Sequence, residues 1–208
     1  MLIKILKLLG IFLIGLLFWE SNSLHCEEEF PEWVPKGAVK AARGLLVDDR
    51  EYAEWLFSMR LEDLKRCELK HPFEVIQINY YDHEPGEDIK TSFIRNNYYG
   101  FGVYLDDKWV AEISVRYEDN KWKYLGSSVI NEKYRKEDPL GVIYSKYPVS
   151  DSTKFCRTHY GERRYFVEQD GKIVKVIICS VIENGTLYVE PEQHMANEKK
   201  KIMRNIEV

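Results

Sequence analysis

The sequence predicts an α+β fold: two or three short N-terminal helices packed on an antiparallel β-sheet, followed by a second β-meander. Two observations lead to this class. The hydrophobic period changes once, near residue 72, from about 3.6 residues to about two. Beyond that point, β-rich segments alternate with turn signals, of which Asp170-Gly171 is the clearest. The composition is globular, with 45% hydrophobic and 31% charged residues among 208, and excludes a collagen, a coiled-coil rod and a wholly disordered chain.

Residues 1–23 are typical of an export signal. Lys4 and Lys7 precede an uninterrupted apolar run of 12 residues, 8–19. This run is short for a membrane span, which takes about 20 residues. The sequence therefore predicts a cleaved signal peptide and an extracytoplasmic protein, either secreted, periplasmic or at the cell surface. The alternative is an uncleaved anchor, which would be the protein's only contact with the membrane.

The rest of the chain is predicted to form one domain. We expect a single α+β domain over residues 24–190 and a polar tail over 191–208. Two segments within the domain could be related β-meanders, 72–130 and 152–190. The motivation is that Val103–Val110 is similar in pattern to Phe166–Val174, about 64 residues later. Any two hairpins share this pattern, so independent origin is the alternative.

Residues 30–71 are expected to be helical. Pro35 suits a helix start, and Asp48 and Asp49 can cap a second short helix. A third segment follows, and His71-Pro72 is expected to end the helical part because a residue before proline is driven to extended geometry. The apolar stripe that predicts the first helix has the spacing i, i+3, i+4, i+7 and consists of Ala38, Val39, Ala41, Ala42, Leu45 and Leu46.

From residue 73 the pattern is that of strands. Between Tyr99 and Leu105, apolar residues alternate with Gly100 and Gly102. The next strand, 109–117, should have a dry face and a wet face, with Glu112 on the wet one. A short helix or turn should start at Asp138-Pro139. Later strands are expected at 153–160, 163–169, 172–182 and 186–189, with 172–182 apolar on both faces and therefore central.

Four cysteines behind an export signal suggest disulfides. We lean to the pairs Cys26–Cys67 and Cys156–Cys179, since each pair lies in one half of the chain. The second pair requires its two strands to be direct neighbours, because a bridge needs Cα atoms about 4.4–6.8 Å apart. The alternative is that Cys67 and Cys179 are buried thiols.

No motif of catalytic or metal-binding specificity occurs. G-x-S-x-G is absent, as are the flanks of cysteine proteases. Cys67-x3-His71 and Cys156-x2-His159 could supply a tetrahedral zinc set, but export favours oxidised thiols. The acidic loop 82–88 lacks the EF-hand spacing and reads as a solvated turn. We therefore predict no cofactor, no metal and no catalytic residue.

Tyrosine clusters are the most distinctive feature. Asn79-Tyr80-Tyr81 and Asn96-Asn97-Tyr98-Tyr99 flank the acidic loop, and adjacent residues on a strand point to opposite faces. One tyrosine of each pair should therefore face outward. Exposed tyrosines with amide and guanidinium groups suit sugar or peptide recognition. The candidate binding residues are Tyr81, Arg95, Asn97 and Tyr98.

Taken as a whole, the sequence predicts a non-catalytic exported module that binds a protein, peptide or glycan at the cell envelope or outside the cell. The net charge of −4 gives no electrostatic footprint for nucleic acid. The alternatives are an exported hydrolase of unrecognised type and a membrane-anchored structural component of the envelope.

Overall fold

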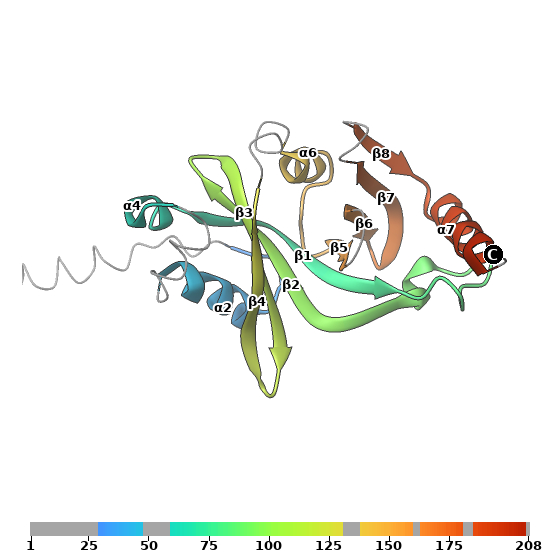
Figure 1. The fold of residues 1–208 in the computed structure, drawn as a ribbon, viewed down its shortest axis with the longest axis horizontal. Coiled ribbons are helices and arrows are strands. Elements are labelled where there is room, and N and C mark those ends of the chain that lie inside the picture. Colours follow the sequence, from blue (N-terminus) through green and yellow to red (C-terminus); the bar gives the residue numbers. More distant parts are fainter. Residues whose placement is uncertain (1–28, 48–58, 131–137, 160–162, 181–184, 207–208) are drawn as a thin grey trace, which may run out of the picture.

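The computed structural model describes residues 29–47, 59–130, 138–159, 163–180 and 185–206 (Figure 1). The fold is α+β and is built on one eight-stranded sheet with the strand order β4-β3-β2-β1-β5-β6-β7-β8. The strands are β1 (Glu68–Ile78), β2 (Phe93–Leu105), β3 (Lys108–Glu118), β4 (Lys121–Val129), β5 (Thr153–Thr158), β6 (Arg163–Gln169), β7 (Lys172–Ser180) and β8 (Gly185–Val189). The helices are α2 (Lys36–Val47), α4 (Leu61–Leu64), η1 (Ile89–Ser92, a 3₁₀-helix), α6 (Pro139–Lys146) and α7 (Pro191–Ile206).

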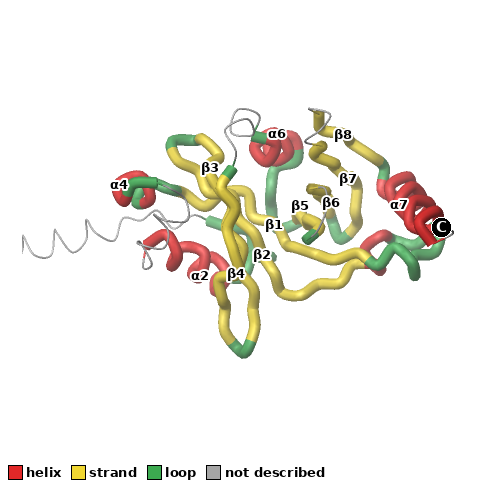
Figure 2. The backbone as a smooth tube through the Cα atoms, viewed as in Figure 1, coloured by secondary structure: helices red, strands yellow, loops and turns green. Residues whose placement is uncertain are grey.

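The sheet is mixed, which overturns the predicted architecture. The first four strands form one antiparallel meander and the last four form another, but the two are joined into a single sheet because β1 pairs in parallel with β5. The helices are spread along the chain, with α6 between the meanders and α7 after them (Figure 2). The prediction of N-terminal helices on an antiparallel sheet, followed by a separate meander, is therefore wrong. A parallel pairing between distant segments leaves no local pattern in the sequence.

The strand β1 begins earlier than expected and runs through His71-Pro72. The register shifts between Lys70 and Phe73, so this dipeptide forms a bulge in which His71 adopts a φ of 54°. A bulge tolerates the missing N–H of a proline. The shift also turns the strand over, so that Leu69 faces one side of the sheet and Phe73 faces the other. The prediction that this dipeptide ends a helical region is wrong for that reason.

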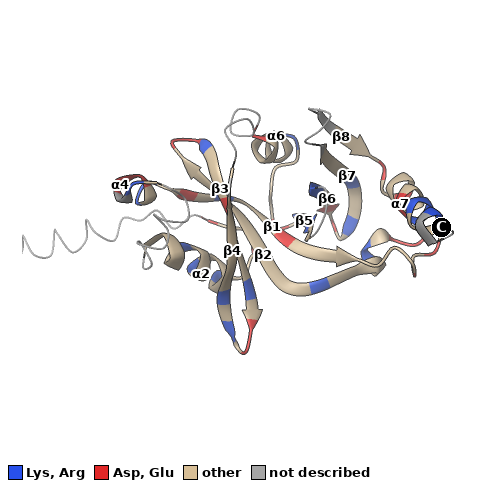
Figure 3. Cartoon of the chain, viewed as in Figure 1, with Lys and Arg blue, Asp and Glu red and all other residues tan. Residues whose placement is uncertain are grey.

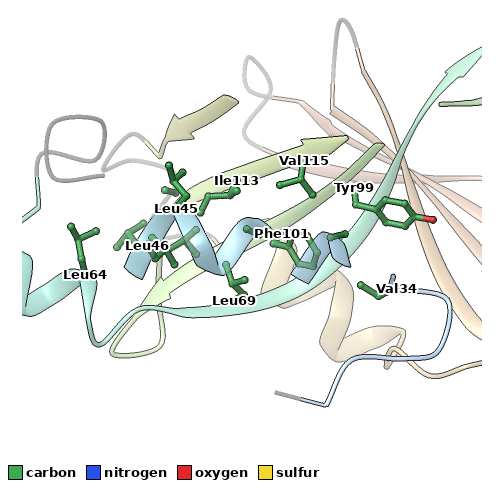
Figure 4. Close-up of a cluster of buried hydrophobic side chains, with 14 residues drawn as sticks. Val34, Leu45, Leu46, Leu64, Leu69, Tyr99, Phe101, Ile113 and Val115 are labelled. Atoms are coloured by element: carbon green, nitrogen blue, oxygen red, sulfur yellow. The ribbon is translucent and has the colours of Figure 1, made fainter. Parts of the chain in front are cut away.

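Each face of the sheet carries its own core. The face that includes Phe101 and Val115 packs under α2, in a cluster with Leu45 and Leu46 (Figure 4). The opposite face packs under α6, around a set of buried aromatic and aliphatic residues: Phe73, Tyr104, Trp109, Leu140, Ile143, Tyr144, Phe155 and Tyr165. A third cluster lies under α7 and contains Phe166, Val176 and Met195. The sheet is thus covered on both faces, as buried strands require.

The two central hairpins have the same register. In β2–β3, Val103 pairs with Ala111 and a bulge follows directly before Tyr104. In β6–β7, Val167 pairs with Lys175 and a bulge follows at the same step. Each residue of the second hairpin lies 64 positions after its counterpart in the first. Corresponding residues also face a helix in each half: Phe101 and Ile113 pack under α2, while Tyr165 and Ile177 pack under α6.

Two glycines open a space on the α6 face of β2. Gly100 pairs with Phe73 and with Ser114, and Gly102 pairs with Glu112. A Cβ atom at Gly100 would lie 2.2 Å from Cε2 of Phe73, and one at Gly102 would lie 2.7 Å from Cε2 of Tyr104. Aromatic rings therefore rest directly on the backbone at these positions, which side chains on β2 would prevent.

Replacing Gly100 by alanine should destabilise the protein by about 1–3 kcal/mol, because the ring of Phe73 would have to leave its place in a packed core. The midpoint and slope of urea unfolding would measure the loss. Gly126→Ala is the matched control, since a Cβ atom there meets nothing within 4 Å. It should change stability by less than about 0.5 kcal/mol. Equal effects of the two substitutions would contradict the packing of Phe73 on Gly100.

Candidate functional site

The structure separates the predicted binding residues. Tyr81 is 59% exposed and lies beyond Ile78, where β1 ends. Tyr98 is half-buried, and its ring meets His159 edge-on at a centroid distance of 5.0 Å. Arg95 and Tyr98 pair with the consecutive residues Ile76 and Val75, so they point to opposite faces of the sheet. Arg95 and Tyr98 therefore do not share a face of the sheet, and ligand binding by any of the four residues stays a prediction.

Asn97 lies in an irregularity of β2. The pairing shifts between Tyr98 and Arg95, so residues 96 and 97 have no direct partners on β1. Asn97 is exposed and adopts a φ of 49°, a conformation that asparagine tolerates better than most residues. Its role in the fold is therefore to shape the bulge.

Arg95 belongs to a buried ionic network, which we call the Glu74 cluster and define as Glu74, Lys90, Arg95, Lys154 and Glu168. Glu74, which is 3% exposed, pairs with Arg95 and, at 2.6 Å, with Lys154. Arg95 reaches Glu168 at 3.1 Å, and Lys90 reaches the same carboxylate at 2.8 Å. The network ties the first meander to the second across the parallel β1–β5 pair. The network has three basic and two acidic side chains, and each of them contacts at least one group of opposite charge, which is typical of a structural element.

The predicted pair Cys156–Cys179 is not a disulfide. Cys156 and Cys179 lie on β5 and β7, which are separated by β6. Cys156 pairs with Phe166, which in turn pairs with Val176, so Cys179 also lies further along its strand. The other predicted pair involves Cys26, which lies outside the described residues. Cys67 is half-buried and its thiol donates to the carbonyl of Asp63 at 3.4 Å.

A second polar group surrounds the first turn of α7. His194 is 2% exposed, and its Nε2 lies 3.3 Å from the hydroxyl of Tyr80. Arg164 contacts the same hydroxyl at 3.4 Å and pairs with Glu198 at 3.2 Å. Burial and the guanidinium of Arg164 lower the pKa of His194 to about 4. The imidazole is therefore neutral at pH 7 and helps to fix α7, whose basic surface residues are seen in Figure 3.

The third polar group, on the α6 face, has most of the buried polar side-chain atoms that find no hydrogen-bond partner among the described residues. We call it the Glu112 cluster and define it as Trp109, Glu112, Arg157, Arg163 and Tyr165. Glu112, on β3, is 3% exposed and accepts a hydrogen bond from Nη1 of Arg157 at 2.7 Å. Arg163 lies 3.6 Å from the same carboxylate oxygen. The cluster thus joins β3 to β5 and β6, across the intervening strands β2 and β1.

The position of the Arg157 side chain depends on the glycines of β2. Its guanidinium lies over the ring of Phe73, 4.2 Å from the centroid, and that ring lies over Gly100. Arg163 lies 5.4 Å from the ring centroid of Trp109. Burial would lower the pKa of Arg157, and the carboxylate of Glu112 raises it, so that the net shift is upward. The guanidinium of Arg157 is therefore charged, and both guanidinium groups lie against aromatic rings.

Four buried polar atoms of the Glu112 cluster find no hydrogen-bond partner among the described residues. They are Nε1 of Trp109, Oε1 of Glu112, Nε of Arg157 and the hydroxyl of Tyr165. The hydroxyl of Tyr165 lies beside Arg157 without meeting the geometry of a hydrogen bond. Burial raises the pKa of Tyr165, so this hydroxyl keeps its proton. Each such atom costs about 1–3 kcal/mol when it stays unsatisfied, and a concentration of four calls for an explanation.

Sequence reasoning missed this cluster for an identifiable reason. The strand β3 was expected to have a wet face, but residues 109–115 are buried on both faces. Glu112 therefore lies in the interior and not in solvent. The available signal was the pair Gly100 and Gly102, because glycines inside a strand mark a close approach of other groups. The rings of Phe73 and Tyr104 lie on these glycines. The partners of Glu112 come from residues 157 and 163, too far along the chain for a local pattern to reveal.

The described residues contain no group of three or more His, Cys, Asp or Glu side chains that could hold a metal ion. Nor do they contain a helix that is long and apolar enough to cross a membrane. The chain matches no model of a known protein family, no curated protein and no solved structure. Its function must therefore be argued from the geometry of its own residues.

Acid should weaken the fold through His194. Its pKa is about 4 in the folded protein against an ordinary value of 6.5, so its stabilising effect is complete above pH 6.5 and declines as the pH falls toward 4. We expect about 2–3 kcal/mol of unfolding free energy to be lost through this group between pH 7.5 and 4.5. In urea unfolding, the free energy of unfolding of His194→Gln should fall by about 2–3 kcal/mol less than that of the wild type between pH 7.5 and 4.5. His159→Gln, at an exposed position, should keep most of it; indistinguishable slopes for all three proteins would contradict the assignment.

The thiol of Cys156 should be unreactive in the native protein. The side chain is fully buried, and burial with the carboxylate of Glu74 raises its pKa to about 12. Reactivity requires the thiolate. Iodoacetamide at pH 8 should therefore modify Cys156 at least about 100-fold more slowly in the native protein than in urea, as followed by peptide mass spectrometry. Equal rates in the two conditions would show that the residue is accessible.

Proposed function

We propose that this chain is an exported, non-catalytic binding module for a protein, peptide or glycan, and that its ligand binds at the Glu112 cluster. The proposal of export comes from the sequence of residues 1–23, which lie outside the described part of the chain. The observation that carries the proposal of binding is the set of four buried polar atoms without partners in the described structure. Buried polar groups are almost always satisfied, so four such atoms in one cluster require an explanation, and a functional role is the one proposed here.

The cluster has the properties of a recognition site. Its groups are held in place: Arg157 by Glu112 and the ring of Phe73, and Tyr165 by the core under α6. Pre-organised groups lose little entropy on binding. The cluster also reaches the surface, since the side chain of Arg163 is 33% exposed and Ser128 beside Glu112 is exposed. A ligand could therefore contact it from that side.

The alternative of a hydrolase has weaker support. The Glu112 cluster contains a single carboxylate, whereas glycoside hydrolysis in its usual form uses two. The thiol of Cys156 lies on the opposite face of the sheet, with a pKa raised to about 12, and is a poor nucleophile. The arrangement thus favours binding over covalent chemistry.

Glycan and peptide arrays probed with the purified protein would test the proposal. We expect at least one class of ligand to be retained by the wild-type protein and retention to fall at least about tenfold for Arg163→Met, which removes one charge-assisted contact. Arg116→Met is the matched control, because Arg116 is paired with Glu118 at the surface and should bind like the wild type. Retention of nothing by the wild type, or equal retention by Arg163→Met, would refute the proposal.

A further inference from the structure

We infer that α7 acts as an acid-released latch, a helix that closes over the second meander at neutral pH and detaches in acid while the rest of the fold stays intact. The inference is independent of the proposed function, because α7 packs on Phe166 and the Glu112 cluster includes Tyr165, which points to the other face of the sheet. It is carried by the polar nature of the contact between α7 and the sheet.

The buried surface of α7 is mostly polar. Among the residues of α7 whose burial is described, three are buried, namely His194, Met195 and Glu198, and only the methionine is apolar. The shorter helix α2 buries four apolar side chains: Ala38, Ala42, Leu45 and Leu46. Apolar packing is what usually holds a helix on its sheet. The attachment of α7 therefore depends on its polar contacts to an unusual degree.

These polar contacts need a neutral imidazole and a charged carboxylate. Nη1 of Arg164 donates to the hydroxyl of Tyr80 at 3.4 Å, and that hydroxyl lies 3.3 Å from Nε2 of His194. A neutral Nε2 can accept the hydroxyl proton, whereas a protonated one becomes a second donor beside the guanidinium. Arg164 also pairs with Glu198 at 3.2 Å. Acid therefore acts against both contacts, by charging the histidine and by neutralising the glutamate.

The groups around the imidazole of His194 favour its neutral form. Burial is the largest cause of its lowered pKa; Arg164 on β6 and Lys201 on α7 lower the pKa further, and Glu198 raises it. The strand β7 and the 3₁₀-helix η1 also contact α7, and no charged side chain described on either of them acts on this pKa. His83 contacts α7 through its backbone carbonyl, which accepts a hydrogen bond from a lysine of the helix.

The size of the effect follows from the two protonation states. The pKa of His194 is about 4 in the docked helix against an ordinary 6.5, so lowering the pH from 7.5 to 4.5 favours the detached helix about 70-fold. Burial alone would raise the pKa of Glu198, but its pairing with Lys201 and Arg164 lowers it, so its protonation acts in the same direction. The cores under α2 and α6 contain neither residue, and α7 is the last element of the chain, so its release separates no strands.

Oxidation of methionine by hydrogen peroxide, followed by peptide mass spectrometry, tests the inference in the intact protein. Met195 is 3% exposed and Met203, on the same helix, is 54% exposed, so the ratio of their oxidation rates reports the detachment of α7. We expect this ratio to rise at least about tenfold between pH 7.5 and 4.5. Met59, which packs against the core under α2, should change by less than about twofold relative to Met203.

Two variants assign the effect to one residue. His194→Gln keeps a neutral polar side chain and should lose most of the rise, while His159→Gln, at an exposed position, should keep it. An unchanged ratio in the wild type, an equal rise in His194→Gln or a parallel rise at Met59 would overturn the latch.

Amide exchange of the wild type decides the case in which His194→Gln already oxidises Met195 as fast as Met203 at pH 7.5. Loss of protection at pH 4.5 that is confined to α7, after correction for the intrinsic exchange rate, supports the inference. Loss of protection throughout the sheet, or in no segment, contradicts it.

Discussion

The buried ion pair between Glu112 and Arg157 constrains the arrangement of both halves of the molecule. Glu112 lies on β3 and Arg157 on β5, with two strands between them in the sheet. For the two side chains to meet at 2.7 Å, the residues of β2 and β1 between them must leave room above the sheet for the long side chain of Arg157. Gly100 and Gly102 meet that requirement, and the ring of Phe73 fills the space beneath the guanidinium. Removing one partner would leave a charge in the interior, and filling the glycine positions would displace the ring under the guanidinium, so the pair and the glycines depend on each other.

The comparison of the two central hairpins shows why a polar cluster occurs on one side only. The hairpins share register and bulge position, and their helix-facing residues correspond. Their other faces differ. Where the second hairpin has Phe166 paired with Val176 under α7, the first has Gly102 paired with Glu112. The second hairpin thus has an ordinary apolar core, whereas the first has glycines covered by the rings of Phe73 and Tyr104 and a buried carboxylate. Polar groups that displace a core at a cost in stability are expected where function requires them.

The sequence predicted single turns, strands and helix starts better than it predicted how they are arranged in one sheet. The hairpin turn at Asp170-Gly171, the strands and the start of α6 at Asp138-Pro139 follow from turn chemistry and period, and the structure contains them. The expected order of helices and sheet was wrong, because the parallel pairing of β1 with β5 joins residues more than 80 positions apart, such as Glu74 and Cys156. The Glu112 cluster was missed for the same kind of reason. Its members lie on three strands, and alternation alone assigned Glu112 to solvent, whereas β3 is buried on both faces at this position.

A double-mutant cycle between Glu112→Leu and Arg157→Met measures the constraint on which this account depends. Unfolding free energies from urea titrations of the four proteins give the coupling between the two side chains. We expect each single substitution to cost about 3–5 kcal/mol of unfolding free energy, because it leaves a buried charge without its partner. The double variant should recover about 2 kcal/mol or more relative to the sum of the two losses. Coupling near zero, with additive losses, would show that the two residues act independently and would contradict the central role of this pair.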